Sequence, residues 1–118
     1  MKRRDVLAGL GAVSAGSALP RIATAQEPWP SRPITMVVPF PPGGQADLAA
    51  RPIAQALEKL LGRPVVVDNR GGAGGALGNA AVARAAPDGY TLLMTLSSLA
   101  VLPESSRLFG RAPAYEVT

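Results

Sequence analysis

The chain has 118 residues, of which 47% are apolar and 17% are charged, a composition typical of a globular protein. It contains no histidine and no cysteine, which excludes from these residues a Ser-His-Asp or Cys-His nucleophile and a zinc site of imidazole or thiolate ligands. The formal net charge is +4, but beyond the N-terminal segment the basic residues are scattered singly and aromatic residues are few, so nucleic acid is not an expected partner.

The first 25 residues have the three parts of a cleavable export signal. A basic start at residues 2–4 precedes an apolar stretch over residues 6–19, and an Ala-Thr-Ala cleavage site occupies residues 23–25. Paired arginines favour the twin-arginine export route, with the ordinary secretory route as the alternative. The apolar stretch is too short and glycine-rich to span a bilayer. We therefore expect a periplasmic protein without a membrane anchor.

After an extended, proline-rich lead-in over residues 26–33, the mature part begins with a strand, a loop and a helix. The continuous apolar run over residues 34–38 is typical of a strand buried on both faces. Residues 39–44 form a tight loop of prolines and glycines, and apolar spacing predicts a helix over residues 46–61. Pro52 should kink this helix or delay its start.

Two more strands and two more helices are expected further along the chain. They are predicted in this order: a helix C-cap at Gly62, a buried strand over 65–67, a glycine-rich loop over 68–75, a helix over 76–86, a turn over 87–89, a strand over 90–94 and a short helix over 105–110. The order is β-α-β-α-β, and connections of this length favour a parallel sheet with right-handed crossovers. The fold class is α/β.

The glycine-rich loop after the second strand does not fit a nucleotide site. Its glycines miss the dinucleotide-binding spacing, and no acidic residue follows at the expected distance. We therefore expect no cofactor, and no metal. For Gly74 and Gly75, close helix–strand packing and a direct ligand contact are about equally supported.

The loop over residues 39–44 predicts an anion site. Two prolines stiffen it, while Gly43 and Gly44 leave backbone amides accessible at the end of a buried strand and the start of a helix. Pro41 and Pro42 belong to the same candidate site. Asp47 is better explained as a cap of the first helix turn than as a ligand contact. A carboxylate beside an anion would repel it.

Three further polar residues are candidates near this loop. Arg51 either reaches the site or lies in solvent, and solvent is favoured because exposed basic side chains are common. Ser97 and Ser98 follow the third strand. In a 2-1-3 strand order, the loops after strands 1 and 3 flank the point where ligands bind in open α/β sheets. The two serines are therefore equally well explained as loop residues or as hydroxyl donors to a ligand.

Four motifs together resemble a known family, the periplasmic solute-binding receptors of tripartite tricarboxylate transporters, or Bug family. They are residues 29–34, residues 38–44 with Asp47 and Arg51, residues 68–70 leading into residues 72–75, and residues 87–91. They occur in the family's order and span nearly all of residues 29–99. The resemblance implies the βαβαβ portion of the first lobe of a two-lobed Venus-flytrap fold.

The resemblance also implies a function and a site. A monomeric receptor would bind a small carboxylated metabolite between its lobes and deliver it to membrane permease subunits. The ligand carboxylate would meet the loop from Phe40 to Gly44, with help from the loop from Thr95 to Ser98. The resemblance also implies residues that support these contacts without touching the ligand, namely Asp47, Arg51, Gly74 and Gly75.

Family members continue well beyond the length of this chain. Residues 34–118 are therefore expected to be an incomplete first lobe, not competent to bind on its own. Two alternatives stay open from the residues themselves. One is an exported α/β enzyme that uses the same loop as an oxyanion or phosphate site. The other is a truncated product without activity.

Overall fold

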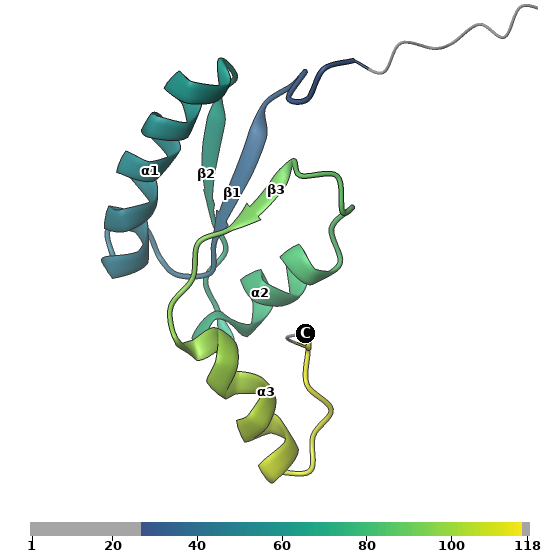
Figure 1. Cartoon of the computed structure of the whole chain (residues 1–118). Helices are drawn as coiled ribbons and strands as arrows, with labels where there is room; N and C mark the ends of the chain where they lie inside the picture. The colour runs from purple at the N-terminus through teal and green to yellow at the C-terminus, as the bar shows by residue number, and fades with distance from the viewer. Residues whose placement is uncertain (1–26, 117–118) are drawn as a thin grey trace, which may run out of the picture.

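The computed structural model describes residues 27–116, and the predicted export signal lies outside the described residues. Three parallel strands form one sheet in the order β2-β1-β3, with helices packed around it (Figure 1). The elements are β1 (Ile34–Val38), α1 (Gln45–Leu61), β2 (Val65–Asn69), a 3-10 turn (Ala73–Gly75), α2 (Ala76–Ala83), β3 (Thr91–Leu93) and α3 (Ser98–Leu108). The predicted α/β class, parallel sheet and 2-1-3 order are confirmed.

The central strand β1 has a different helix on each face. Its even-numbered residues Ile34, Met36 and Val38 face α1, where buried alanines at positions 46, 50 and 54 let the helix approach closely. On the other face, Pro39 packs against α2, since a Cβ added to Gly78 would lie 2.6 Å from the Cβ of Pro39. Figure 1 shows α1 and α2 on opposite sides of the sheet.

The first helix begins and ends close to its predicted bounds. It starts at Gln45, so Pro52 lies inside α1 and does not delay its start. At the other end, Gly62 has a φ of 67° and its N–H donates to the carbonyl of Glu58 at 2.9 Å. This left-handed cap confirms the role predicted for Gly62.

Several boundaries differ from the sequence predictions. The helix predicted over residues 76–86 ends at Ala83, and the strand predicted over residues 65–67 runs on to Asn69. Val66 is 53% exposed, so the expectation of a fully buried second strand is wrong. The reason is that β2 is an edge strand, and α2 packs against β1 and β3 instead of covering it.

The C-terminal helix is longer than predicted. In place of a short helix over residues 105–110, α3 runs from Ser98 to Leu108 and contains Pro103. A proline inside a helix cannot donate to the carbonyl four residues earlier, here that of Leu99. The hydroxyl of Tyr115 donates to this carbonyl at 3.1 Å. A residue outside the helix thus satisfies the group that Pro103 leaves unpaired.

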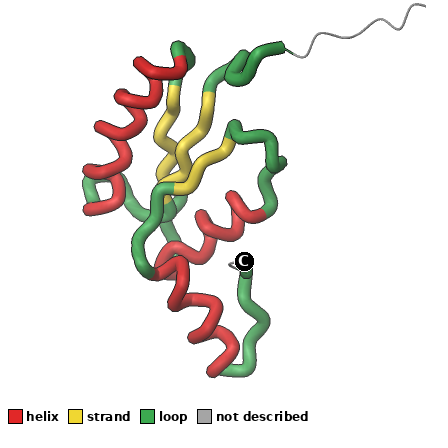
Figure 2. Tube along the Cα trace, in the orientation of Figure 1, coloured by secondary structure: helices red, strands yellow, loops and turns green. Residues whose placement is uncertain are grey.

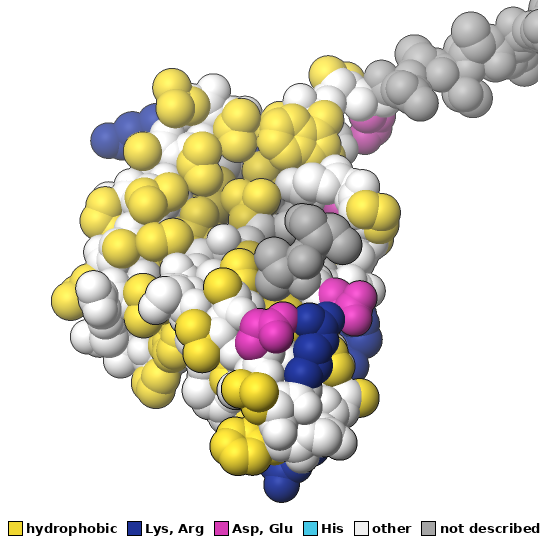
Figure 3. Space-filling model, turned by 60° about the horizontal axis from the view of Figure 1, so that its bottom comes forward, with side chains coloured by type: hydrophobic (Ala, Val, Ile, Leu, Met, Phe, Trp, Pro, Cys, Tyr) yellow, Lys and Arg dark blue, Asp and Glu magenta, His cyan; other side chains and the backbone are white. Residues whose placement is uncertain are grey.

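The surface carries many apolar side chains. Figure 3 shows hydrophobic side chains over much of one face. Exposed large apolar residues include Trp29, Leu48, Leu60, Leu77, Val101, Leu108 and Phe109. Within residues 27–116, no helix combines the length and apolar character needed to cross a membrane.

Candidate functional site

The carboxyl ends of the three strands meet at one edge of the sheet, the lower edge in Figure 2. The N–H of Arg70, just past β2, donates to the carbonyl of Val38 at 2.7 Å, and the N–H of Met94, just past β3, donates to that of Val37 at 2.9 Å. The loop over residues 39–44 therefore lies between the loops that follow β2 and β3. This is the position where ligands bind in open α/β sheets.

Asp47 lies at the centre of a hydrogen-bond network behind this loop. Its side chain is only 3% exposed. The oxygen Oδ2 accepts from the N–H of Gly43 and from Nε of Arg51, both at 2.9 Å, and Oδ1 accepts from Nδ2 of Asn69 at 3.0 Å. These donors, Arg51 first, then Gly43 and Asn69, lower the pKa of Asp47 to about 2.

The network joins Asp47 to the start of α1, where a cap was expected, but with a different geometry. Gly44 is the N-cap of α1, and Asp47 is the third helical residue. Its carboxylate reaches back to the N–H of Gly43, one residue before the N-cap, whereas the acidic member of a capping box accepts from the N–H of the N-cap residue itself. A negative charge in the first turn also interacts favourably with the helix dipole. Asp47 thus fixes the loop to the helix.

Asn69 was not among the candidates from the sequence. Its amide nitrogen donates to Asp47 and also to the backbone carbonyl of Phe40, at 3.2 Å. One signal in the sequence could have pointed to it, because Asn69 belongs to the motif at residues 68–70. Its two acceptors lie 22 and 29 residues earlier in the chain, so only the packing of β2 beside β1 brings them together.

The loop glycines differ in what their amides do. The N–H of Gly43 is bonded to Asp47, and that of Gly44 makes a long contact of 3.5 Å to the carbonyl of Pro41. The first N–H groups of α1, at Gln45 and Ala46, have no acceptor within the helix by its geometry. An anion at this edge would therefore meet the amides of the helix start more readily than that of Gly43.

Phe40, Pro41 and Pro42 form the outer part of the loop. Phe40 is half-buried, and both prolines are exposed. A Cβ added to Gly75 would lie 3.2 Å from the Phe40 ring, so Gly75 provides room for that ring. This contact favours the packing explanation for Gly75, while Gly74 is exposed and turns the chain with a φ of 64°.

The loop after β3 brings three hydroxyl groups to the same edge. Ser97 is the exposed N-cap residue of α3, and Ser98 is the first residue of that helix. The hydroxyl oxygens of Thr95 and Ser98 are buried, and within the described residues neither has a hydrogen-bond partner. Unpaired buried hydroxyls are uncommon in native proteins and call for a partner.

Arg51 lies on α1, and its side chain bonds to Asp47. Its side chain is 53% exposed, and it lines a cavity of about 330 Å³ between α1 and β2, together with Glu58 and Val66. The structure therefore agrees with the solvent-exposed position favoured for Arg51. Hydrogen bonding to Asp47 raises its pKa further above its already high usual value.

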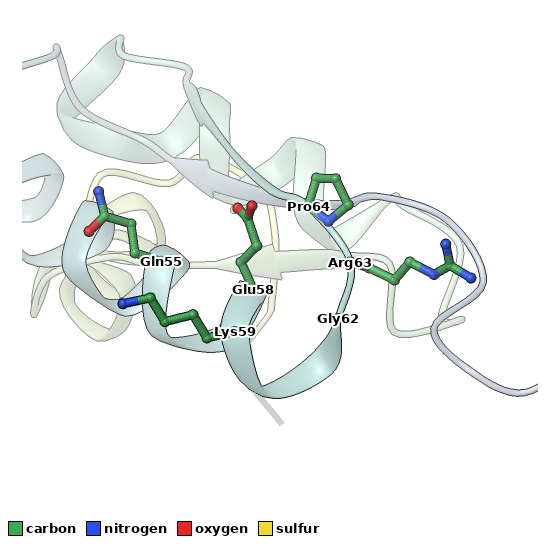
Figure 4. Close-up of a pocket in the computed structure, with 6 residues that line it drawn as sticks. All are labelled: Gln55, Glu58, Lys59, Gly62, Arg63 and Pro64. Atoms are coloured by element: carbon green, nitrogen blue, oxygen red, sulfur yellow. The ribbon is translucent and has the colours of Figure 1, made fainter.

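The other prominent cavities lie at the opposite end of α1. One, of about 410 Å³, is lined by Gln55, Glu58, Lys59, Gly62, Arg63 and Pro64 (Figure 4). A second, of about 650 Å³, includes Trp29 and Leu61. In Figure 4 the Glu58 carboxylate points from α1 toward β2, where the N–H of Val65 makes a long contact of 3.5 Å with it. These two cavities contain no residue of the 40–44 or 95–98 loops.

Comparison with known proteins gives a consistent result. Residues 49–111 match the family described as tripartite tricarboxylate transporter family receptor. The chain is similar to Protein BugT of Bordetella pertussis, with 49% identity over 98 residues, covering 83% of this chain and 29% of BugT. It is also 54% identical over 76 residues to a protein of Agrobacterium vitis, covering 64% of this chain and 22% of that relative. The chain thus spans less than a third of these relatives' length.

Two solved structures resemble this fold. The periplasmic binding protein BugD is 54% identical, with a TM-score of 0.54 over 55% of this chain and 22% of BugD. MatC of Rhodopseudomonas palustris, solved with bound malate, is 50% identical, with a TM-score of 0.53 over 54% of this chain and 22% of MatC. At identities of 50% and 54%, the similarity to these two structures extends to the sequence as well as to the fold.

Proposed function

The chain belongs to the tripartite tricarboxylate transporter receptor family, and on this premise we propose that it is part of a periplasmic receptor that binds a small carboxylated metabolite. In a protein of its relatives' length, these residues form part of the first lobe. The loops over residues 40–44 and 95–98 form one wall of the ligand site. The receptor binds as a monomer and delivers its ligand to membrane permease subunits.

The observation that carries this proposal is the position of the loop over residues 39–44. It leaves the central strand at the carboxyl edge of a parallel sheet and leads directly into the N-terminus of a 17-residue helix. Helix N-terminal amides and the positive end of the helix dipole favour an anion there. The malate bound by MatC is a ligand of the expected class.

The loop alone cannot supply the whole affinity of a receptor. Micromolar binding needs about 8 kcal/mol, whereas a helix N-terminus contributes about 0.3–1 kcal/mol and each charge-assisted hydrogen bond about 1.5–3 kcal/mol before the cost of association. The exposed Ser97 supplies a further donor after β3, whereas the hydroxyls of Thr95 and Ser98 are buried in this structure. Contacts from a second lobe would supply the rest.

Membership of a receptor family supports this function over the exported enzyme that the sequence also allowed. An oxyanion site needs a nucleophile and a base beside it. Both histidine and cysteine are absent from the 118 residues. Family membership therefore favours binding over catalysis at this loop.

The test is a binding assay on the complete gene product that carries these residues. Thermal unfolding would be followed with malate, adipate and citrate, and with the corresponding methyl esters as uncharged controls. We expect one of the acids to raise the melting temperature and its ester to have no effect. If none of a wider set of mono-, di- and tricarboxylates stabilises the protein, the proposed function is wrong.

A further inference from the structure

We propose that Asn69 is a positioning residue of the ligand site: its side-chain amide holds the loop over residues 40–44 in the conformation that presents the first amides of α1 to an anion. The proposal rests on the carboxylate-binding function proposed above. It assigns a role at the ligand site to the last residue of β2, which contacts the loop through the carbonyl of Phe40.

The contacts of Asn69 join three elements. From the last position of β2, its Nδ2 donates to the carbonyl of Phe40 at 3.2 Å and to Oδ1 of Asp47 at 3.0 Å. The first acceptor is in the loop after β1 and the second is in the first turn of α1. One side chain therefore fixes where the loop leaves the sheet and where it enters the helix.

A direct ligand contact by this amide does not fit the geometry. An asparagine amide has two N–H donors, and both are accounted for by Phe40 and Asp47. Asn69 is also partly buried, on the side of the loop that faces α1 and β2. It therefore acts on a ligand through the loop and not by touching it.

The same contact removes an electrostatic obstacle. Asp47 places a carboxylate close to a site meant for an anion, and like charges at short range disfavour binding. Gly43, Arg51 and Asn69 all donate hydrogen bonds to the Asp47 carboxylate, and these donors compensate its negative charge within the protein. Removing Asn69 would leave Oδ1 without the donor that it has in this structure.

The experiment uses the complete gene product and the variants Asn69→Ala and Asn69→Ser. Serine supplies one donor in place of two, so it keeps a polar group but cannot hold both acceptors. Asp68→Ala is the matched control, since Asp68 precedes Asn69 on β2 and pairs with Arg70 at the surface. Under conditions in which all variants are folded, we would measure the hydrogen-exchange rate of the Gly43 amide and the affinity for malate, adipate and citrate.

We expect both Asn69 variants to exchange the Gly43 amide about tenfold faster and to bind the acid about tenfold more weakly, while Asp68→Ala behaves like the wild type. Unchanged exchange at Gly43 overturns the positioning role, even if binding weakens, because the effect would then not pass through the loop. Unchanged affinity in both variants overturns it as well.

The two proposals fail in different ways. If the wild-type protein binds no carboxylate, the proposed function is wrong, and the exchange rate of Gly43 still decides whether Asn69 holds the loop. If the wild type binds and the variants match it in both measurements, the receptor function stands and the role of Asn69 is wrong.

Discussion

The hydroxyl of Tyr115 donates a hydrogen bond to the carbonyl of Leu99, the group in α3 that Pro103 leaves without its usual partner. The same hydroxyl accepts from Nδ2 of Asn79 at 2.9 Å, and both side chains are buried. Tyr115 thereby joins the segment after α3 to α2 and α3.

Replacing Tyr115 by phenylalanine should destabilise the protein without changing its shape. The change leaves the Asn79 amide unpaired in a buried position and the Leu99 carbonyl unpaired in a part-buried one, which costs about 1–3 kcal/mol. The measurement is the free energy of unfolding in urea. Tyr90→Phe is a suitable control, because the Tyr90 hydroxyl bonds to Ser31 in a part-buried position where water can replace it. An equal effect of the two changes would contradict this account.

Gly78→Ala should destabilise the packing of α2 against the sheet. A Cβ at Gly78 would lie 2.6 Å from the Cβ and 2.7 Å from the Cα of Pro39, and 2.8 Å from the carbonyl oxygen of Arg70. Two of these atoms belong to the backbone and cannot move aside cheaply, so we expect a loss of about 1–3 kcal/mol. Gly44→Ala is the control for stability, since a Cβ there is 3.4 Å from its nearest neighbour. A melting temperature unchanged by Gly78→Ala would refute this packing.

Acid should weaken the network around Asp47 in a defined pH range. The pKa of Asp47 falls from 3.8 to about 2 on folding, so the folded state favours the carboxylate. This contribution to stability is complete above pH 3.8 and is lost as the pH falls toward 2. The measurement is the difference in unfolding free energy between the wild type and Asp47→Asn as a function of pH.

We expect this difference to shrink across that range, because the wild-type carboxylate becomes protonated and its ionic advantage disappears. Glu104→Gln serves as the control, since Glu104 pairs with Arg107 at the surface and exposed pairs contribute little. A wild-type advantage over Asp47→Asn that stays constant from about pH 5 to about pH 2 would show that Asp47 does not have the lowered pKa.

Gly44→Val should weaken ligand binding more than it weakens the fold. Gly44 has a φ of −79°, which any residue adopts, and a Cβ there is tolerated. The branched side chain would nevertheless cover the first amides of α1, where the anion is proposed to bind. In the complete gene product we expect loss of the thermal shift caused by the acid, with folding retained. Full binding by this variant would place the ligand elsewhere.

Much of the local structure could be predicted from short stretches of sequence. The apolar run at residues 34–38 predicted β1, the prolines and glycines at residues 39–44 predicted the loop before α1, and Gly62 predicted the C-cap of α1. Each of these depends on conformational preferences of neighbouring residues. The family motifs then predicted which α/β fold contains them.

The sequence by itself thus determined the class of fold, the order of the elements and the position of the candidate loop. The tertiary structure decided which partners each buried polar group has. Asn69 bonds to Phe40 and Asp47 because β2 lies beside β1, and Tyr115 bonds to the Leu99 carbonyl that Pro103 leaves unpaired. Val66 is exposed because α1 covers only the face of β2 that carries Val65 and Val67. These contacts join residues far apart in the chain, and local preference carries no information about such partners until the chain has folded.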